Sequence, residues 1–342
     1  MKKIFFLFMS LCYFSSVSAQ TIDEMVFFGD SLTDNGNLYS ASFKLIPKSP
    51  PYYLGRFSNG PVWSDILSDF YQTKYQIQSS NYAVGGATVI LRRPREGALP
   101  YFLSKEVQKY LKNSNHEQRS KTLYFLWMGG NDYMDEKKET PEALVNSVVN
   151  EMVTQIRTLI TNGGKRFVII DLPDFAKAPF AGKLDQATQD RLRLLSEMNH
   201  SKILEVVENL QKEYPNFKFI FIDVYNTFND MFLNIEKYNL KYDTHISNIA
   251  NACWTGGYTL AADKSTAHMQ ADLQMTALMD AVLHSRSLSA AYQVGQLQSL
   301  GVAACDNADD YLFWDTVHPT TAGHQILGQL IIEQLESLSA IE

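Results

Sequence analysis

A serine that follows a short apolar run is the first residue in this chain that could act as a nucleophile. Ser31 lies in the segment Gly29-Asp30-Ser31-Leu32-Thr33, directly after the apolar residues 25–28. Open α/β sheets bind ligands at the carboxyl ends of their strands, so a serine at this point is expected at the mouth of a site. The segment is also typical of an ordinary strand-to-helix turn, because Asp and Ser are good N-caps. Taken alone, it leaves both interpretations open.

An aspartate and a histidine near the carboxyl end could activate that serine. Asp315 and His318 are three residues apart, just before a predicted final helix. A serine hydroxyl is a weak nucleophile until a base takes its proton. His318 could be that base, and Asp315 could orient its ring and stabilise the imidazolium. Since a single histidine beside a proline is more often structural, the prediction for His318 depends on its combination with Ser31.

Two glycine-containing segments carry donors that suit an oxyanion. One is residues 81–88, which include Gly85 and Gly86, and the other is Gly129-Gly130-Asn131-Asp132. A tetrahedral oxyanion needs two or three fixed donors, each worth ~3 kcal/mol of barrier. A glycine N–H and the Asn131 amide are both suitable. Each segment on its own is more typical of a plain turn.

Apolar runs alternate with helical patterns along the chain, and these elements are expected to position the reactive residues. The runs are apolar on both faces, which is typical of buried parallel strands. Strands are predicted over residues 25–28, 123–128, 167–170 and 217–222, and helices over 141–160, 186–214 and 320–338. The alternation predicts one doubly wound α/β domain. Residues 39–63, rich in Pro and Tyr, are expected to form an irregular loop.

In this order and spacing, the four segments resemble the GDSL or SGNH hydrolase family, whose hallmark residues are Ser, Gly, Asn and His. The resemblance covers about residues 24–338. It implies a flavodoxin-like three-layer sandwich with a central parallel sheet, and a triad of Ser31, Asp315 and His318.

The resemblance also implies an oxyanion hole and a cofactor-free reaction. Its donors would be the Ser31 N–H, the Gly86 N–H and the Asn131 side chain. Gly86 is chosen over Gly85 because the family's glycine lies five residues after the segment's asparagine, here Asn81. No metal or organic cofactor is implied.

Three further segments narrow the resemblance to a secreted bacterial branch of the family. They are Pro-Pro-Tyr-Tyr at 50–53, Arg-Phe-Ser-Asn-Gly-Pro-Val-Trp at 56–63 and Tyr-Leu-Phe-Trp-Asp at 311–315. The branch holds phospholipases A, lysophospholipases A and glycerophospholipid:cholesterol acyltransferases. It implies a lysophospholipid or phospholipid substrate, cholesterol as a further acyl acceptor, and peripheral contact with membranes. The alternatives are a carbohydrate acetyl-esterase of the same fold and a non-catalytic secreted binding protein.

Residues 1–19 are typical of a secretory signal peptide. Lys2 and Lys3 precede an apolar run over 4–14, and small residues lead to Ala19. The run is too short to cross a bilayer as a helix. We therefore expect a secreted or periplasmic protein whose mature part, 20–342, is a single domain.

The mature chain would be strongly acidic. Removing residues 1–19 takes away two lysines and no acid, which moves the net charge from −7 to −9 and disfavours nucleic acid binding.

Two cysteines, Cys253 and Cys305, remain after removal of the signal peptide. In an oxidising compartment such a pair predicts a disulfide, with two unpaired buried thiols as the alternative. No Cys/His spacing is typical of a zinc site. Members of the branch can carry a disulfide-bonded loop at this place, so residues 254–304 are predicted to be an insertion and a candidate lid.

Overall fold

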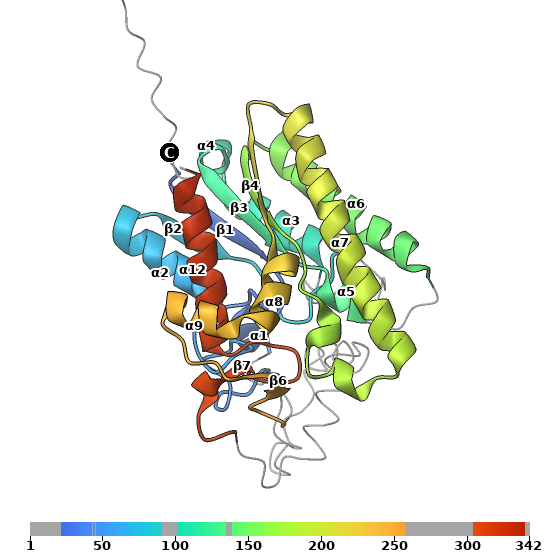
Figure 1. The fold of residues 1–342 in the computed structure, drawn as a ribbon. Coiled ribbons are helices and arrows are strands. Elements are labelled where there is room, and N and C mark those ends of the chain that lie inside the picture. The colour runs from blue at the N-terminus through green and yellow to red at the C-terminus, as the bar shows by residue number, and fades with distance from the viewer. Residues whose placement is uncertain are drawn as a thin grey trace, which may run out of the picture.

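A five-stranded parallel sheet forms the centre of the molecule in a computed structural model, which describes residues 22–42, 44, 46–90, 102–134, 139–256 and 304–338 (Figure 1). The strands are β1 (Glu24–Gly29), β2 (Gln78–Asn81), β3 (Thr122–Trp127), β4 (Arg166–Ile170) and β5 (Lys218–Ile222). Their spatial order is β2-β1-β3-β4-β5, and all neighbours are parallel. This is the flavodoxin-like order, in which ligands bind where the strand order reverses, beside β1.

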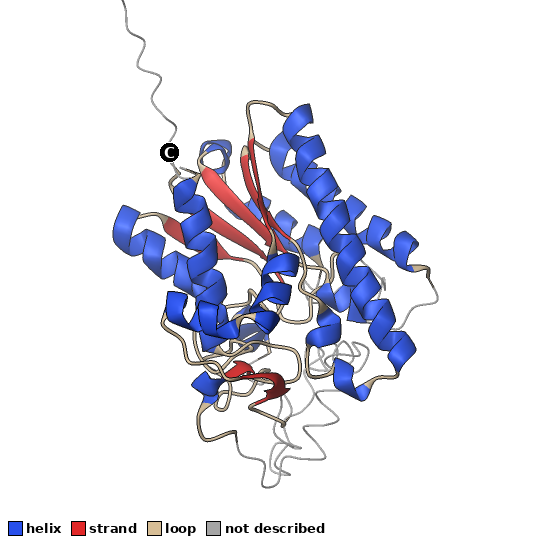
Figure 2. Cartoon of the chain, in the orientation of Figure 1, coloured by secondary structure: helices blue, strands red, loops and turns tan. Residues whose placement is uncertain are grey.

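Helices cover both faces of the sheet (Figure 2). On one side α2 (Trp63–Tyr75) packs against α12 (Thr321–Ser337). On the other, α3 (Leu103–Asn113), α6 (Pro141–Thr161) and α7 (Gln186–Glu213) pack in series. The predicted three-layer sandwich with a central parallel sheet is therefore confirmed.

Aromatic side chains tie the strands together inside this sandwich. The rings of Phe27 and Phe125 stack at 4.7 Å between β1 and β3. Phe167 on β4 stacks at 5.3 Å on Tyr124 and at 5.3 Å on Phe219. Such pairs contribute roughly 0.5–1.5 kcal/mol each beyond the area they bury, so they help to hold the sheet that carries the site.

The predicted strands and helices match the observed ones to within one residue at each end. The edge strand β2 was not predicted, because Gln-Ser-Ser-Asn carries no apolar signal and is only partly buried. Several helices were also not predicted: α1 (Asn37–Ala41), α2, α3, α4 (His116–Ser120), α5 (Gly130–Met134), α8 (Val224–Leu233) and α9 (Ile235–Tyr242). In its described part, the expected irregular loop 39–63 consists mostly of turns, apart from the end of α1 and the first residue of α2.

A second, smaller sheet precedes the histidine-bearing loop. It pairs β6 (Asn248–Ala252) with β7 (Tyr311–Phe313) in parallel. The predicted disulfide between Cys253 and Cys305 is present directly beyond β6, with a Cα–Cα distance of 4.9 Å. Around this sheet lies a separate small apolar core that includes Met231, Phe313 and Ile326.

Two predicted segments lie outside the described residues. They are the signal peptide, 1–19, and most of the insertion 254–304, so the lid stays a prediction. Within the described part of the chain, no helix has the length and apolar character needed to cross a bilayer.

Candidate active site

Ser31, His318 and Asp315 form a line of hydrogen-bonded side chains, although 287 residues separate the first two. Ser31 follows β1, and the other two lie between β7 and α12. His318 Nε2 is 2.7 Å from Ser31 Oγ, and His318 Nδ1 is 2.8 Å from Asp315 Oδ2. All three residues are less than a tenth exposed. This arrangement allows the imidazole to accept the hydroxyl proton while the carboxylate stabilises the charged ring.

The Asp315 carboxylate is held by more than the histidine ring. Its Oδ1 accepts the backbone N–H groups of Val317 and His318, both at 2.8 Å. Its Oδ2 accepts the Tyr52 hydroxyl at 2.8 Å. Burial alone would raise the pKa of this carboxyl, but His318 and the two backbone donors keep the pKa below its ordinary value. Asp315 is therefore ionised, as an orienting carboxylate must be.

The candidate oxyanion donors lie on turns that follow three neighbouring strands. Ser31 follows β1, Gly86 follows β2 and Asn131 follows β3. Gly86 has a φ of 77°, in the left-handed region that favours glycine. The Asn131 side-chain amide donates to the Ala87 carbonyl at 2.8 Å, which ties the glycine turn to the end of β3. The three segments singled out in the sequence thus meet at one edge of the sheet.

Buried carboxyl groups brace the turn that carries Ser31. The Asp34 carboxylate accepts the Gly85 N–H at 2.8 Å, and Glu106 on α3 accepts the Gly29 N–H at 3.0 Å. Gly29 must be glycine, because a Cβ there would lie 2.7 Å from Thr33 Oγ1. Burial raises the pKa of Asp34 to about 6 and that of Glu106 well above its usual value. These groups fix the backbone on either side of the nucleophile.

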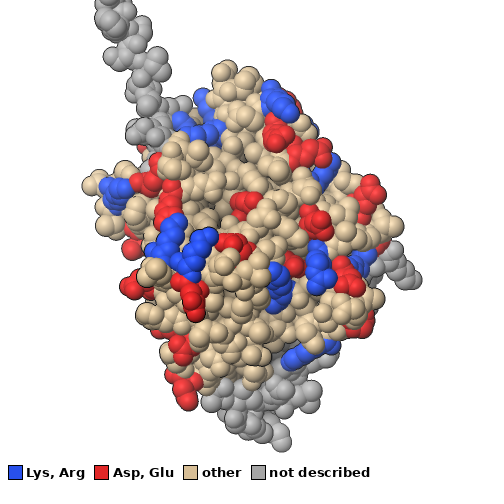
Figure 3. Space-filling view, viewed as in Figure 1, with Lys and Arg blue, Asp and Glu red and all other residues tan. Residues whose placement is uncertain are grey.

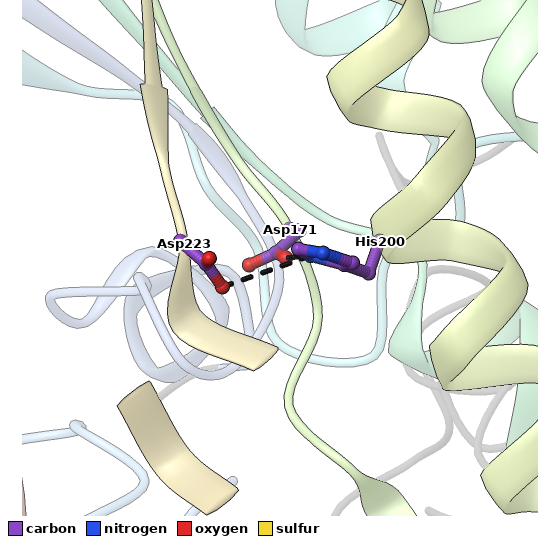
Figure 4. A group of neighbouring side chains, drawn as sticks. All are labelled: Asp171, His200 and Asp223. Carbon is purple, nitrogen blue, oxygen red and sulfur yellow. Dashed lines mark hydrogen bonds and ion pairs between the residues drawn. The ribbon is translucent and has the colours of Figure 1, made fainter. Parts of the chain in front are cut away.

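A second cluster, Asp171, His200 and Asp223, has the residue types of a metal site (Figure 4). His200 Nδ1 is 2.6 Å from Asp171 Oδ2 and 3.6 Å from Asp223 Oδ1. Asp171 Oδ1 also accepts the Val224 N–H at 2.6 Å, and Asp223 Oδ1 caps α8 through the Asn226 N–H at 2.9 Å. Because the three side chains bond to one another and to the backbone at the start of α8, we interpret the cluster as a structural link between β4, α7 and α8.

Two residues that contact the site were not singled out in the sequence. Tyr52 lies in the Pro-Pro-Tyr-Tyr segment, which supported the resemblance to the secreted branch and the prediction of an irregular loop but gave no role to this tyrosine. Glu106 did carry a signal, because it falls on the apolar face of α3 with Leu103, Val107 and Tyr110. A carboxyl on the buried face of an amphipathic helix predicts a buried polar contact.

Comparisons with known proteins show which family this chain is similar to. The family model described as GDSL-like Lipase/Acylhydrolase matches residues 25–331. A phosphatidylcholine-sterol acyltransferase of Aeromonas hydrophila is 27% identical, over 94% of this chain and 92% of its own. A thermolabile hemolysin of Vibrio parahaemolyticus is 26% identical, over 95% of this chain and 66% of its own. A GDSL esterase/lipase of Arabidopsis thaliana is 25% identical, over 88% and 85% of the two chains.

Proposed function

This chain belongs to the GDSL-like lipase/acylhydrolase family, a family of carboxylic ester hydrolases, and on that premise we propose that it cleaves lysophospholipids or phospholipids through an acyl-enzyme on Ser31. The observation that carries the proposal is the 2.7 Å contact between His318 Nε2 and Ser31 Oγ, backed by Asp315. The relative that acts on phosphatidylcholine and a sterol supports the lipid class and suggests cholesterol as a second acyl acceptor.

In the first step, His318 Nε2 takes the proton of the Ser31 hydroxyl while Oγ attacks the ester carbonyl. The negative charge moves onto the carbonyl oxygen, where the N–H groups of Ser31 and Gly86 and the Asn131 amide stabilise it. When the tetrahedral intermediate collapses, the bond to the alcohol oxygen breaks. His318 then returns its proton to that alcohol, which leaves as a lysolipid or glycerophospho group.

In the second step, an acceptor hydroxyl releases the acyl group. His318 deprotonates a water molecule, whose oxygen attacks the acyl-enzyme, and Ser31 leaves with the proton as the fatty acid departs. If cholesterol supplies the hydroxyl, the product is a sterol ester instead. Activity falls at acid pH, because an imidazolium cannot accept a proton from either nucleophile.

The direct test is Ser31→Ala, with Ser147→Ala as a control, since Ser147 is exposed on α6. Both variants and the wild type are assayed on lysophosphatidylcholine, phosphatidylcholine and an acetylated sugar, with and without cholesterol. We expect the Ser31 variant to lose at least about 10³-fold in kcat and to resist a fluorophosphonate probe. Wild-type activity in that variant would exclude Ser31 as the nucleophile.

The substrate panel also separates the alternatives. A strong preference for the acetylated sugar would favour a carbohydrate esterase. No turnover and no probe labelling of the wild type would favour a binding protein.

Export by residues 1–19 is a separate part of the proposal. The segment has the order of charge, apolar run and small residues that signal peptides share. We expect Edman sequencing of the exported protein to begin at Gln20. An exported chain that begins at Met1 would show that no signal peptide is removed.

A further inference from the structure

The turn that carries Gly86 is held by a buried carboxyl group at each end. Before Gly86, the Gly85 N–H donates to Asp34 Oδ2 at 2.8 Å. After it, the Val89 N–H donates to Asp132 Oδ2 at 2.7 Å. Both aspartates are completely buried. Because a buried backbone N–H needs an acceptor, these two bonds fix the backbone on either side of the candidate oxyanion donor.

The two carboxyl groups come from the segments that carry the other two candidate donors. Asp34 lies three residues after Ser31, and Asp132 lies directly after Asn131 on α5. The glycine turn is therefore held by the same pieces of chain that would supply its partner donors. The position of Gly86 is thus coupled to the positions of Ser31 and Asn131.

Two adjacent side chains on α5 bind this turn together. The Asn131 amide donates to the Ala87 carbonyl at 2.8 Å, and Asp132 accepts the Val89 N–H two residues further along the turn. An asparagine amide carries two N–H groups in one plane, so the bond to Ala87 also sets the direction of the second N–H. The direction of the Asn131 amide therefore depends on where the turn lies, and Asp132 fixes the end of that turn.

We propose that Asp132 is a positioning residue of the oxyanion hole, which keeps the Gly86 N–H and the Asn131 amide directed at the same substrate oxygen. In this role it contacts no substrate and transfers no proton. The inference rests on the proposed function, because it needs an oxyanion formed from an ester. One oxyanion donor is worth about 10²–10³ in kcat, and a misplacement of about 1 Å can cost 10²-fold. Loss of Asp132 should therefore lower kcat far more than it changes KM.

The experiment compares Asp132→Ala and Asp132→Asn in the purified protein, with p-nitrophenyl butyrate as substrate. Alanine leaves the Val89 N–H without this acceptor, and we expect kcat to fall about 10- to 100-fold while KM stays within about twofold. Asparagine keeps one acceptor oxygen but turns an amide N–H toward the second donor, the Ile90 N–H, so kcat should fall about threefold. The rate of labelling by a fluorophosphonate should fall in the same order, because that reaction also places an oxygen in the oxyanion hole.

The matched control is Asp223→Asn. Asp223 Oδ1 accepts the Asn226 N–H at 2.9 Å at the start of α8, after the edge strand β5. This variant changes the same kind of bond between a carboxyl group and the backbone, but outside the proposed site. We expect it to keep the kcat and KM of the wild type. Thermal melting of each variant checks that it folds.

A double-mutant cycle with Asn131→Ala separates positioning from a general structural effect. If Asp132 acts through the oxyanion donors, its replacement by alanine should cost at least about threefold less in kcat when the Asn131 amide is already absent. An independent structural role would give the same fold-loss in both backgrounds, because the effects of independent sites add.

The outcomes separate this inference from the proposed function. A wild-type kcat in a folded Asp132→Ala variant would overturn the positioning role and leave the hydrolase intact, and so would equal losses in both backgrounds of the cycle. If the alanine variant does not fold, Asp132→Asn replaces it in both measurements and decides in the same way. Full esterase activity in Ser31→Ala would refute the proposed function itself.

Discussion

At the scale of single residues, a fourth side chain, that of Tyr52, is hydrogen-bonded to the proposed triad. Tyr52 is almost fully buried, and its hydroxyl donates to the same Asp315 oxygen that lies 2.8 Å from His318 Nδ1. Its ring packs edge-on against Trp314 at 6.2 Å, which holds it in place. This hydrogen bond should hold the Asp315 carboxylate in its orientation. Because a donor withdraws negative charge from a carboxylate, it should also weaken the attraction of Asp315 for the proton on the imidazole of His318.

Replacing Tyr52 by Phe should therefore change the pH profile as well as the rate. We expect kcat to fall roughly 2- to 13-fold, the equivalent of one hydrogen bond of about 0.5–1.5 kcal/mol. The acidic limb of the kcat/KM profile should move to higher pH, because the carboxylate would hold the imidazolium proton more tightly. Tyr53→Phe is the control, since Tyr53 is 39% exposed. If the Tyr52→Phe and Tyr53→Phe variants had the same pH profile, Tyr52 would contribute only packing.

At the scale of elements, side chains from other segments fix the loops that carry the reactive residues. The His318 loop is held by segment 58–59: Ser58 Oγ donates to the Pro319 carbonyl at 2.9 Å, and Asn59 Oδ1 accepts the Thr321 N–H at 2.8 Å. The Ser31 turn is held from the opposite face of the sheet by Glu106 on α3. The candidate active-site loops are thus positioned by hydrogen bonds from side chains of other segments.

The buried Glu106 predicts a pH-dependent stability. Burial, with Asp30 and Asp34 nearby, raises the pKa of its carboxyl well above 4.5. Above about pH 4.5 the unfolded chain releases this proton while the folded chain keeps it, so the free energy of unfolding decreases as pH rises toward the folded-state pKa. The Glu106→Gln variant keeps a side-chain oxygen that can accept the Gly29 N–H. It has no carboxyl proton to release, so this decrease in the free energy of unfolding should disappear. We expect this variant to gain stability relative to the wild type as the pH rises through the window above about 4.5.

Urea unfolding at several pH values across that window measures the effect, with the exposed Glu142→Gln as the control. Asp30, with a pKa raised to about 7, and Asp34, at about 6, leave a residual dependence of the same sign. Parallel stability curves for the wild type and Glu106→Gln would show that this carboxyl does not keep its proton in the folded protein.

At the scale of the whole molecule, stability comes from the core and the cross-link more than from surface charge. On the face shown in Figure 3, basic and acidic side chains are interspersed and no large basic area appears. Exposed pairs such as Arg157–Glu213, at 2.7 Å, contribute about 0–1 kcal/mol each. The disulfide, by contrast, joins residues 52 apart, and Cys305 donates its N–H to the Cys253 carbonyl at 3.0 Å.

Replacing both cysteines, Cys253→Ser with Cys305→Ser, should destabilise the protein by about 4 kcal/mol, the chain-entropy value for a loop of this length. We also expect reduced activity at higher temperature, because Trp254, next to Cys253, donates its N–H to the Trp314 carbonyl at 2.6 Å, one residue before Asp315. Guanidinium unfolding with and without reductant checks this. If a reductant lowered the stability of the double variant as much as that of the wild type, the effect of the reductant would not come from this disulfide.

The sequence by itself determined the alternation of strands and helices, and it singled out the candidate reactive side chains. Runs such as 123–128 and 167–170 are apolar enough to predict buried strands locally, and Ser31, Asn131 and His318 lie beside such elements. Only the tertiary structure decided the polar edge strand β2 and the Tyr52 contact with Asp315. These features depend on side chains far apart in the chain that meet through packing, and no local pattern of residues encodes such a meeting.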